Sequence, residues 1–471
     1  MVQDLTQGSP AKLIVMFCLP LLIGNLFQQL YNISDILIVG RLLGVNALAA
    51  VGATAPIFFV FLLISFGFTG GLTVVTAQRF GAKDIDGMHT SVTHAIMASA
   101  VWCALMSAAL IFFLKPLLRL MNVPAEIISD AYTFMSILSS GLSMIVFYNL
   151  LAGFIRALGD SKTPLYFLIF STLLNIAFNF TLIYYFKFGV AGSALGTVCA
   201  ISIALGACFL YVRKKFPIMK LQKKDWRFDK KTMKEELVIA VPMGLQFSVL
   251  SLSMMVIQAA CNSFGPDVIA AFTAALRIEQ VATQPLLALG MAMATFSAQN
   301  WGAGKLKRIR QGVRFAAATS FAISILMSLG VRYVGSDMIS VFLSKPNAFI
   351  AETGKSYLTI STLFYFFLSM IFIFRNTLQG MGKALIPLIA SVLEFLTRSF
   401  AALYLAKAMG YRGIFFASPV AWVSAMLVVT IGYVLTIRQI KACKSKNYYN
   451  KNKQIIGLKA SINTTTQTLK D

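Results

Sequence analysis

Three acidic residues lie well inside long apolar stretches of the sequence, and they are Asp35, Glu279 and Glu394. An ionisable side chain in a membrane-spanning helix costs at least ~2.5–3.5 kcal/mol on insertion scales, so such residues usually have a function. A carboxyl group in these surroundings can alternate between a protonated and a charged form. Asp35 is therefore a candidate cation-binding residue. The alternative is a carboxylate at the outer end of a helix, close to Arg41.

Neutral oxygen ligands occur in two later apolar stretches. Asn175 and Asn179 are four residues apart, which places both side chains on one face of a helix, and Thr197 follows in the next stretch. Together with Asp35 they form an all-oxygen set, which suits Na⁺ or hydrogen bonds to a protonated Asp35. The other interpretation is ordinary polar packing between helices.

The C-terminal half carries the other intramembrane charges. Glu394 and Arg398 are four residues apart on one expected helix and should pair. Arg277 and Glu279 are two apart and point to different faces, so Glu279 is instead a candidate for attracting a cationic substrate. Glu279, Glu394 and Arg398 are thus candidates for substrate binding or for a structural charge pair.

The sequence lacks the familiar patterns of catalysis. The six cysteines form no CxxC pair and no zinc spacing, and the two histidines, His89 and His94, do not make an HExxH motif. A Walker A motif is also absent. A membrane-embedded enzyme would need clustered His, Asp or Cys within its spans. We therefore predict no catalytic residue, and no cofactor beyond a bound H⁺ or Na⁺.

The composition is that of a membrane protein. Of 471 residues, 58% are hydrophobic and 12% are charged, whereas soluble domains are about 25% charged, and the mean hydropathy is +0.77. We predict an all-α integral membrane protein with twelve transmembrane helices, several of which contain a proline that allows bending. The predicted spans begin near Lys12, Ala47, Ser91, Ile127, Pro164, Val190, Leu237, Val268, Gly312, Ser356, Pro387 and Tyr411.

The net charge of +24 is explained by topology rather than by nucleic-acid binding, because the basic residues sit between the apolar runs. With the N-terminus in the cytoplasm, inside segments carry 29 of the 41 Lys and Arg residues and outside segments carry nine. We predict two helix bundles at residues 1–212 and 237–438. A basic cytoplasmic linker at 213–236 and a polar, disordered cytoplasmic tail at 439–471 complete the chain.

An internal repeat relates the two halves. The sequence AQRFGA at residues 77–82 recurs as AQNWGA at 298–303, an offset of 221. Residues 19–20 recur at 241–242, and RALGDSKTP at 156–164 is matched by QGMGKALIP at 379–387, with offsets of 222 and 223. Six spans in each half share one orientation, so the halves should be related by an axis along the membrane normal, with a central cavity between them. This is a transporter architecture.

The motifs resemble those of the multidrug and toxic compound extrusion (MATE) family over about residues 10–440. Besides the two Gln-x-[Phe/Trp]-Gly-Ala segments and RALGDSKTP, they are YNISD at 31–35, GRLLG at 40–44, NIAFN at 175–179 and GVAGSA at 189–194. The resemblance implies two six-helix bundles forming a V. It also implies export of amphipathic, mostly cationic organic compounds in exchange for H⁺ or Na⁺.

The resemblance also sharpens the expected site. The family uses an aspartate at the motif position of Asp35, which favours a cation-coupling role for Asp35 with Asn175, Asn179 and Thr197. In the family the position of Asn179 is often Asp and sometimes Asn, so one carboxylate is absent here. In repeat register Asn175 corresponds to Arg398, which predicts a one-sided coupling site.

The remaining expectations concern partners and location. We expect a monomer in a bacterial inner (plasma) membrane, with membrane lipid and small organic substrates as its partners and no nucleic acid. The nearest rival function is a flippase for a lipid-linked sugar or another amphipathic lipid. That rival is disfavoured because only three basic residues, Arg277, Arg375 and Arg398, fall within spans.

Overall fold

The structure is a computed structural model that describes residues 2–341 and 347–467, apart from the side chains of Met254 and of residues 443–467. The described residues contain helices and no strands. The α-helices are α1 (Pro10–Leu43), α2 (Val45–Gly81), α3 (Ile85–Leu120), α4 (Ile128–Ser140), α5 (Leu142–Ala157), α6 (Lys162–Phe180), α7 (Gly189–Lys215), α8 (Lys230–Asn262), α9 (Pro266–Ala282), α10 (Gln284–Gly302), α11 (Leu306–Ser340), α12 (Ala348–Leu363), α13 (Tyr365–Gly380), α14 (Leu385–Met409), α15 (Tyr411–Ile414) and α16 (Ala417–Gln467). A π-helix, η1 (Thr181–Tyr185), and two 3₁₀-helices, η2 (Pro217–Met219) and η3 (Lys223–Trp226), complete the list.

The helices account for the twelve predicted spans. Within the described residues, nine helices are long and apolar enough to cross a membrane, and three bent helix pairs bring the number to twelve. The pairs are α4 with α5, α9 with α10 and α12 with α13, bent by 43°, 42° and 49°. Pro285 lies in the first turn of α10, at one of these breaks. Pro20, Pro56 and Pro242 instead lie inside the continuous helices α1, α2 and α8.

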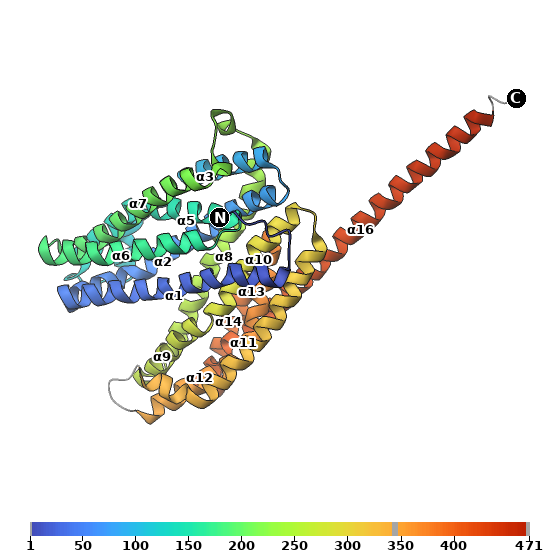
Figure 1. Cartoon of the computed structure of the whole chain (residues 1–471). Coiled ribbons are helices and arrows are strands. Elements are labelled where there is room, and N and C mark those ends of the chain that lie inside the picture. Colours follow the sequence, from blue (N-terminus) through green and yellow to red (C-terminus); the bar gives the residue numbers. More distant parts are fainter. Residues whose placement is uncertain (1, 342–346, 468–471) are drawn as a thin grey trace.

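Two groups of helices diverge from a common end, so that the molecule has the shape of a V (Figure 1). One group contains α1 to α7 and the other contains α8 to α16. The first helix of each group packs in an equivalent way: α1 contacts α6 of its own group and α10 of the other, while α8 contacts α14 of its own group and α2 of the other. The repeat in the sequence is therefore also a repeat in packing.

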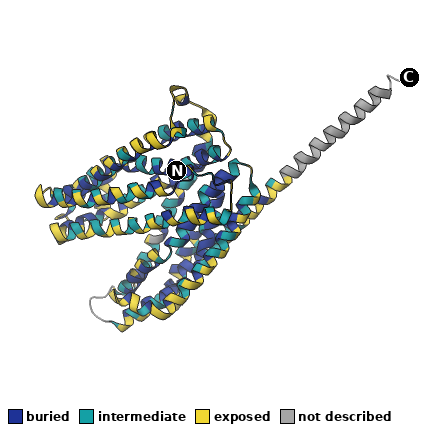
Figure 2. Ribbon diagram, viewed as in Figure 1, coloured by how far each residue is buried: buried dark blue, intermediate teal, exposed yellow. Residues whose placement is uncertain are grey.

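Buried residues concentrate where the groups meet (Figure 2). Many large apolar residues are nevertheless exposed. Ile14 and Phe17 of α1 belong to the same hydrophobic core as Met293 and Phe296 of α10, so the start of α1 is built into the other group. Exposed apolar residues such as Phe112, with 78% of its surface exposed, suit a helix bundle surrounded by lipid.

The connection between the groups is shorter than the linker predicted for residues 213–236. Helix α7 continues to Lys215 and α8 begins at Lys230, because the basic ends of both spans remain helical. The intervening chain packs on α3, where the Thr93 hydroxyl donates to the Asp225 carbonyl at 2.7 Å. Helix α16 runs through the predicted tail as far as Gln467. The disorder predicted for 439–471 stays a prediction, because the side chains from residue 443 onward lie outside the described part.

Candidate functional site

The polar residues predicted in the N-terminal half lie together. Asp35 of α1 accepts a hydrogen bond from the Asn179 amide at 2.6 Å. Asn179 also donates to the side-chain amide oxygen of Asn175 at 3.4 Å, and the Asn175 side chain donates to the Thr197 hydroxyl of α7 at 3.1 Å. A chain of hydrogen bonds therefore links α1, α6 and α7 through one carboxylate and three neutral side chains. We call this set the N-terminal cluster.

Burial differs within the N-terminal cluster. Asn175 and Asn179 are buried, whereas Asp35 is half-buried. The side-chain oxygen of Asn179 has no hydrogen-bond partner among the described residues, although it is fully enclosed. A Cβ added at Gly196 would lie 2.2 Å from that oxygen, so a larger residue where α7 passes Asn179 would displace its amide group. The cluster thus combines an accessible acid with a buried amide that has an unused acceptor.

Two members of this network were missing from the predicted site. The Ser193 hydroxyl donates to Asp35 at 3.4 Å, and the Tyr31 hydroxyl donates to Thr197 at 3.4 Å. Both residues lie in the quoted motifs, and each is four positions before a predicted site residue, Asp35 or Thr197. The i, i+4 rule could have found them.

The C-terminal half contains a different arrangement, which we call the C-terminal triad. Glu394 accepts from Arg398 at 2.6 Å and from Arg375 at 3.1 Å, and all three side chains are buried. Arg398 also donates to the Ser253 hydroxyl at 2.6 Å. The structure thus brings Glu394 and Arg398 together, and it adds Arg375, whose partner the sequence did not indicate.

Glu279 lies apart from the triad's ion pairs. Its carboxylate accepts a hydrogen bond from the Tyr357 hydroxyl of α12 at 2.6 Å, and its other oxygen has no hydrogen-bond partner among the described residues. Phe272 and Phe415 pack edge-on against the Tyr357 ring. Glu279 is therefore a second lone carboxyl group, held by a single phenol among aromatic rings.

The repeated Gln-x-[Phe/Trp]-Gly motifs meet each other at the end where the two groups join. Gln78 donates to the carbonyl of Gly380, and Gln299 donates to the carbonyl of Ala157, both at 2.8 Å. Each glutamine thus reaches into the other half at equivalent positions of the repeat. The backbone N–H of Leu5 adds a hydrogen bond to Gln299 at 2.8 Å. We call this region the closed end.

Close backbone approach at the closed end requires two glycines. A Cβ added at Gly81 would lie 2.0 Å from the Gln299 carbonyl oxygen, and one added at Gly302 would lie 1.8 Å from that of Gln78. These distances leave no room for any side chain. The repeat motif is therefore one of the contacts that hold the two halves together, besides the packing of α2 on α8 and of α1 on α10.

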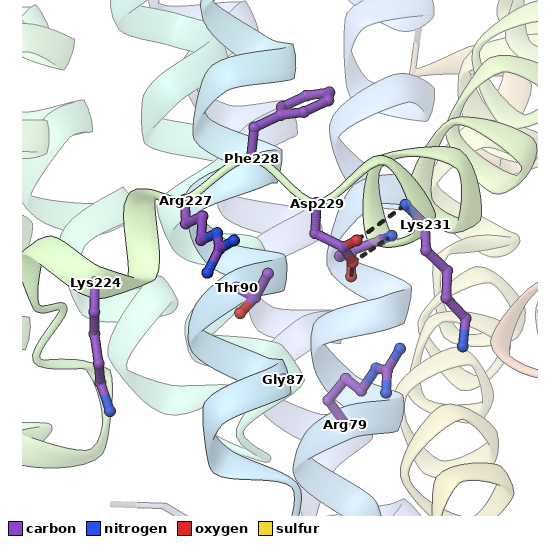
Figure 3. Close-up of a pocket in the computed structure, with 9 residues that line it drawn as sticks. Arg79, Gly87, Thr90, Lys224, Arg227, Phe228, Asp229 and Lys231 are labelled. Atoms are coloured by element: carbon purple, nitrogen blue, oxygen red, sulfur yellow. Dashed lines mark hydrogen bonds between the residues drawn. The ribbon is translucent and has the colours of Figure 1, made fainter.

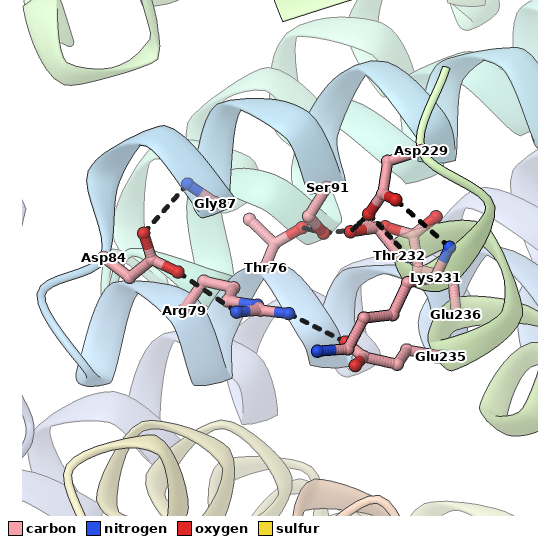
Figure 4. A network of polar contacts seen from close by, with 10 residues as sticks. All are labelled: Thr76, Arg79, Asp84, Gly87, Ser91, Asp229, Lys231, Thr232, Glu235 and Glu236. Carbon is pink, nitrogen blue, oxygen red and sulfur yellow. Dashed lines mark hydrogen bonds and ion pairs between the residues drawn. The ribbon is translucent and has the colours of Figure 1, made fainter. Parts of the chain in front are cut away.

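Glu236 is a further buried carboxyl group, which the sequence did not indicate. It is fully buried on α8 and accepts a hydrogen bond from Ser91 at 2.7 Å, and Ser91 also contacts the Thr76 hydroxyl at 2.9 Å (Figure 4). Next to it Glu235 pairs with Arg79 at 2.8 Å, and Arg79 also reaches Asp84. Glu236 follows a stretch of lysines, so its sequence context resembles a solvated charge cluster and gives no sign of burial.

Comparison with known proteins identifies the family of this chain. The MatE family model matches residues 20–181 and again residues 242–403. The chain belongs to the MatE family. The two matches start at residues 20 and 242, which are 222 residues apart, in agreement with the repeat found in the sequence.

The curated relatives of this MatE protein are named as multidrug resistance proteins. The probable multidrug resistance protein YpnP of Bacillus subtilis is 30% identical over 415 residues, which cover 87% of this chain and 92% of the relative. The probable multidrug resistance protein NorM of Thermotoga maritima is 22% identical over 82% of this chain and 83% of its own. The chain is thus a multi-pass membrane protein of a multidrug efflux transporter family, and not an enzyme by this membership.

Solved structures share the fold. A crystal structure of MATE in the bent conformation has a TM-score of 0.85 at 23% identity and covers 94% of this chain and 98% of its own. A MOP superfamily transporter from Pyrococcus furiosus, described as having a binding pocket of reverse polarity, also has a TM-score of 0.85 at 23% identity, with 93% and 98% covered. At this level of identity the likeness concerns the fold.

Proposed function

We propose that this MatE protein is a secondary antiporter that exports amphipathic, mostly cationic organic compounds across the cell membrane in exchange for a cation bound at Asp35. The observation that supports the coupling role is the N-terminal cluster. Asp35 is a single half-buried carboxylate whose partners, Asn179 and Ser193, are both neutral. Its charge can therefore change without leaving an oppositely charged side chain unpaired.

The coupling cation that this arrangement favours is H⁺. The Asn179 amide group already donates to Asp35 and Asn175, so these oxygens are engaged with hydrogens rather than arranged around a metal ion. Na⁺ would need the amide oxygens of Asn175 and Asn179 turned toward it.

Helix α1 offers a route from cation binding to conformational change. It carries Asp35 against α6 and α7, and its first turns pack on α10 of the other half. Binding a cation at Asp35 changes the hydrogen bonds of α1 and hence the balance between two arrangements of the halves. We place the closed end at the cytoplasmic side, so the arrangement described here is the one that opens outward.

The test uses the purified full chain in proteoliposomes with a fluorescent organic cation such as ethidium. A pH gradient and a Na⁺ gradient are imposed separately, and dye movement is recorded for the wild type and Asp35→Asn. We expect the pH gradient to drive dye movement and the variant to lose it. Asp130→Asn is the matched control, because Asp130 is an exposed carboxylate outside the N-terminal cluster.

The two gradients separate the possible outcomes. Movement driven by Na⁺ alone and lost in Asp35→Asn would keep the antiporter and replace the coupling ion. Full coupled export by Asp35→Asn would overturn the role of the N-terminal cluster. If neither gradient moves the dye in the wild type, drug export itself is wrong and lipid-linked substrates would be tested next.

A further inference from the structure

A cavity of about 590 Å³ lies near the closed end, between α3 and the linker that leads into α8 (Figure 3). This size is in the range of small-ligand sites. Its walls come from both halves: α2 and α3 on one side, the linker and the first turn of α8 on the other. The lining residues are Arg79, Gly87, Thr90, Lys224, Arg227, Phe228, Asp229, Lys231 and Thr232.

The lining is rich in cations, and two of them are unpaired. Arg79 is engaged by Asp84 and Glu235, and Lys224 lies 3.4 Å from Asp86 in an exposed ion pair. By contrast, the side chains of Arg227 and Lys231 have no hydrogen-bond or ion-pair partner among the described residues. Figure 3 shows Arg227 extending from the linker toward Thr90 of α3. Two cationic side chains without a partner in one cavity suit an anion.

The acid in the lining does not cancel this charge. Asp229 accepts hydrogen bonds from the backbone N–H groups of Lys231 and Thr232, at 3.2 and 2.9 Å, and from the Thr232 hydroxyl at 2.6 Å. These bonds from Thr232 and Lys231 lower the pKa of Asp229, so it stays ionised as the cap of α8. Among the described lining residues that have no ion-pair partner, the cations Arg227 and Lys231 outnumber the anion Asp229. Because Asp229 already satisfies the N–H groups of α8, recognition of an anion rests on the side chains.

Aromatic residues place the cavity at the membrane surface. Phe228 in the lining and Trp226 just before it are 62% and 45% exposed. Aromatic rings beside Lys and Arg, at the point where a spanning helix leaves the apolar region, are typical of the membrane–water interface. Residues 213–234 comprise the end of α7, the linker and the start of α8. They contain ten Lys and Arg residues and two acidic residues, which attracts this segment to a negatively charged lipid surface.

We propose that this cavity binds a phosphate group, and that the phosphate is that of an anionic phospholipid headgroup in the adjacent leaflet. Arg227 presents a planar fork of donors and Lys231 a point charge, a pair suited to phosphate oxygens. Phe228 lies beside the glycerol and upper acyl region. Because the walls belong to both halves, a bound headgroup fastens the linker and the start of α8 to α3.

The experiment titrates the purified full chain with phosphatidylglycerol and with phosphatidylcholine of the same acyl chains, and counts bound lipid by native mass spectrometry. Inorganic phosphate is titrated separately by calorimetry. The test variant is Arg227→Gln/Lys231→Gln. The matched control is Arg213→Gln/Lys214→Gln, which removes one Arg and one Lys from exposed positions of the same segment outside the cavity.

We expect the wild type to prefer phosphatidylglycerol, and the cavity variant to bind it on the order of 10- to 30-fold more weakly. The control variant should change binding by less than about threefold, because exposed charges are screened. If inorganic phosphate alone binds and the cavity variant weakens it equally, the phosphate site stands and its natural ligand is soluble. Equal weakening by the two variants, or no preference over phosphatidylcholine together with no phosphate binding, would overturn the site.

Discussion

The two halves of the molecule share one fold but use polar residues in opposite ways. The N-terminal cluster contains one carboxylate, Asp35, among neutral amides and hydroxyls. The C-terminal triad contains one carboxylate, Glu394, between two buried arginines. In repeat register Asn175 corresponds to Arg398. The N-terminal cluster therefore has a neutral amide where the C-terminal triad has a charged guanidinium. Neutralising the first carboxylate leaves no charged partner, whereas neutralising the second leaves two buried cations without their shared counter-charge.

Replacing the central carboxylate should therefore have very different effects in the two halves. Glu394→Gln leaves two buried guanidinium groups without a counter-charge, and we expect a loss of about 3–5 kcal/mol in stability. Asp35→Asn leaves no unpaired charge and should unfold at nearly the wild-type temperature. Thermal unfolding of both variants in one detergent measures the difference. Equal stability of the two variants would contradict the comparison.

The sequence predicted the members of the N-terminal cluster more completely than those of the C-terminal triad, and the reason is physical. An acid within an apolar run and two asparagines at i, i+4 are local signals, and they indicated Asp35, Asn175 and Asn179 without knowledge of the fold. The pairing of Arg375 with Glu394 joins different helices and depends on how α13 packs near α14. Such a contact has no local signature.

The closed end shows the same limit. The repeat indicated both Gln-x-[Phe/Trp]-Gly segments, but it did not indicate that the two copies touch each other. The sequence does not distinguish Glu236 from its neighbour Glu235. Only packing does so, because it buries Glu236 and leaves Glu235 partly exposed in an ion pair with Arg79. Burial of this kind is a tertiary property, so the sequence predicted which elements repeat but not how the repeats meet.

At the closed end, equivalent substitutions in the two halves should have the same effect. This differs from the N-terminal cluster and the C-terminal triad, where we expect different effects. Gly81→Ala and Gly302→Ala each push a Cβ against a backbone carbonyl of the other half. We expect both variants to lose most dye transport, because the halves can no longer approach and the equilibrium between their arrangements shifts. Vesicle transport assays measure this loss.

Gly330→Ala serves as the control for the glycine variants. Gly330 lies inside α11, and a Cβ there meets nothing within 4 Å. This variant should transport as the wild type does, because alanine is favoured over glycine in a helix. Wild-type transport by Gly302→Ala would show that the closed end does not limit the cycle. A loss in only one of Gly81→Ala and Gly302→Ala would show that the halves are not equivalent there.

The smallest effects should come from the individual partners of Asp35, and their order tests how the N-terminal cluster works. The Asn179 amide donates to Asp35 at 2.6 Å, a short charge-assisted hydrogen bond, whereas Ser193 donates at 3.4 Å, near the limit of a hydrogen bond. Asn179→Ala should reduce pH-driven dye export by at least about 10-fold, because a hydrogen bond to a charged group contributes about 1.5–3 kcal/mol. Ser193→Ala should reduce it by less than about threefold.

Initial transport rates in the same vesicles measure both effects, with the amount of inserted protein as the reference. If Ser193→Ala has the larger effect, the hydroxyl of α7 rather than the amide of α6 controls Asp35. The carboxylate would then be regulated by the movement of α7 against α1. If Asn179→Ala has the larger effect, α6 is the controlling helix, and Ala402 at the corresponding position predicts that the C-terminal half lacks this contact. Alanine offers no donor to a carboxylate, so a half with alanine at this position cannot form the same contact.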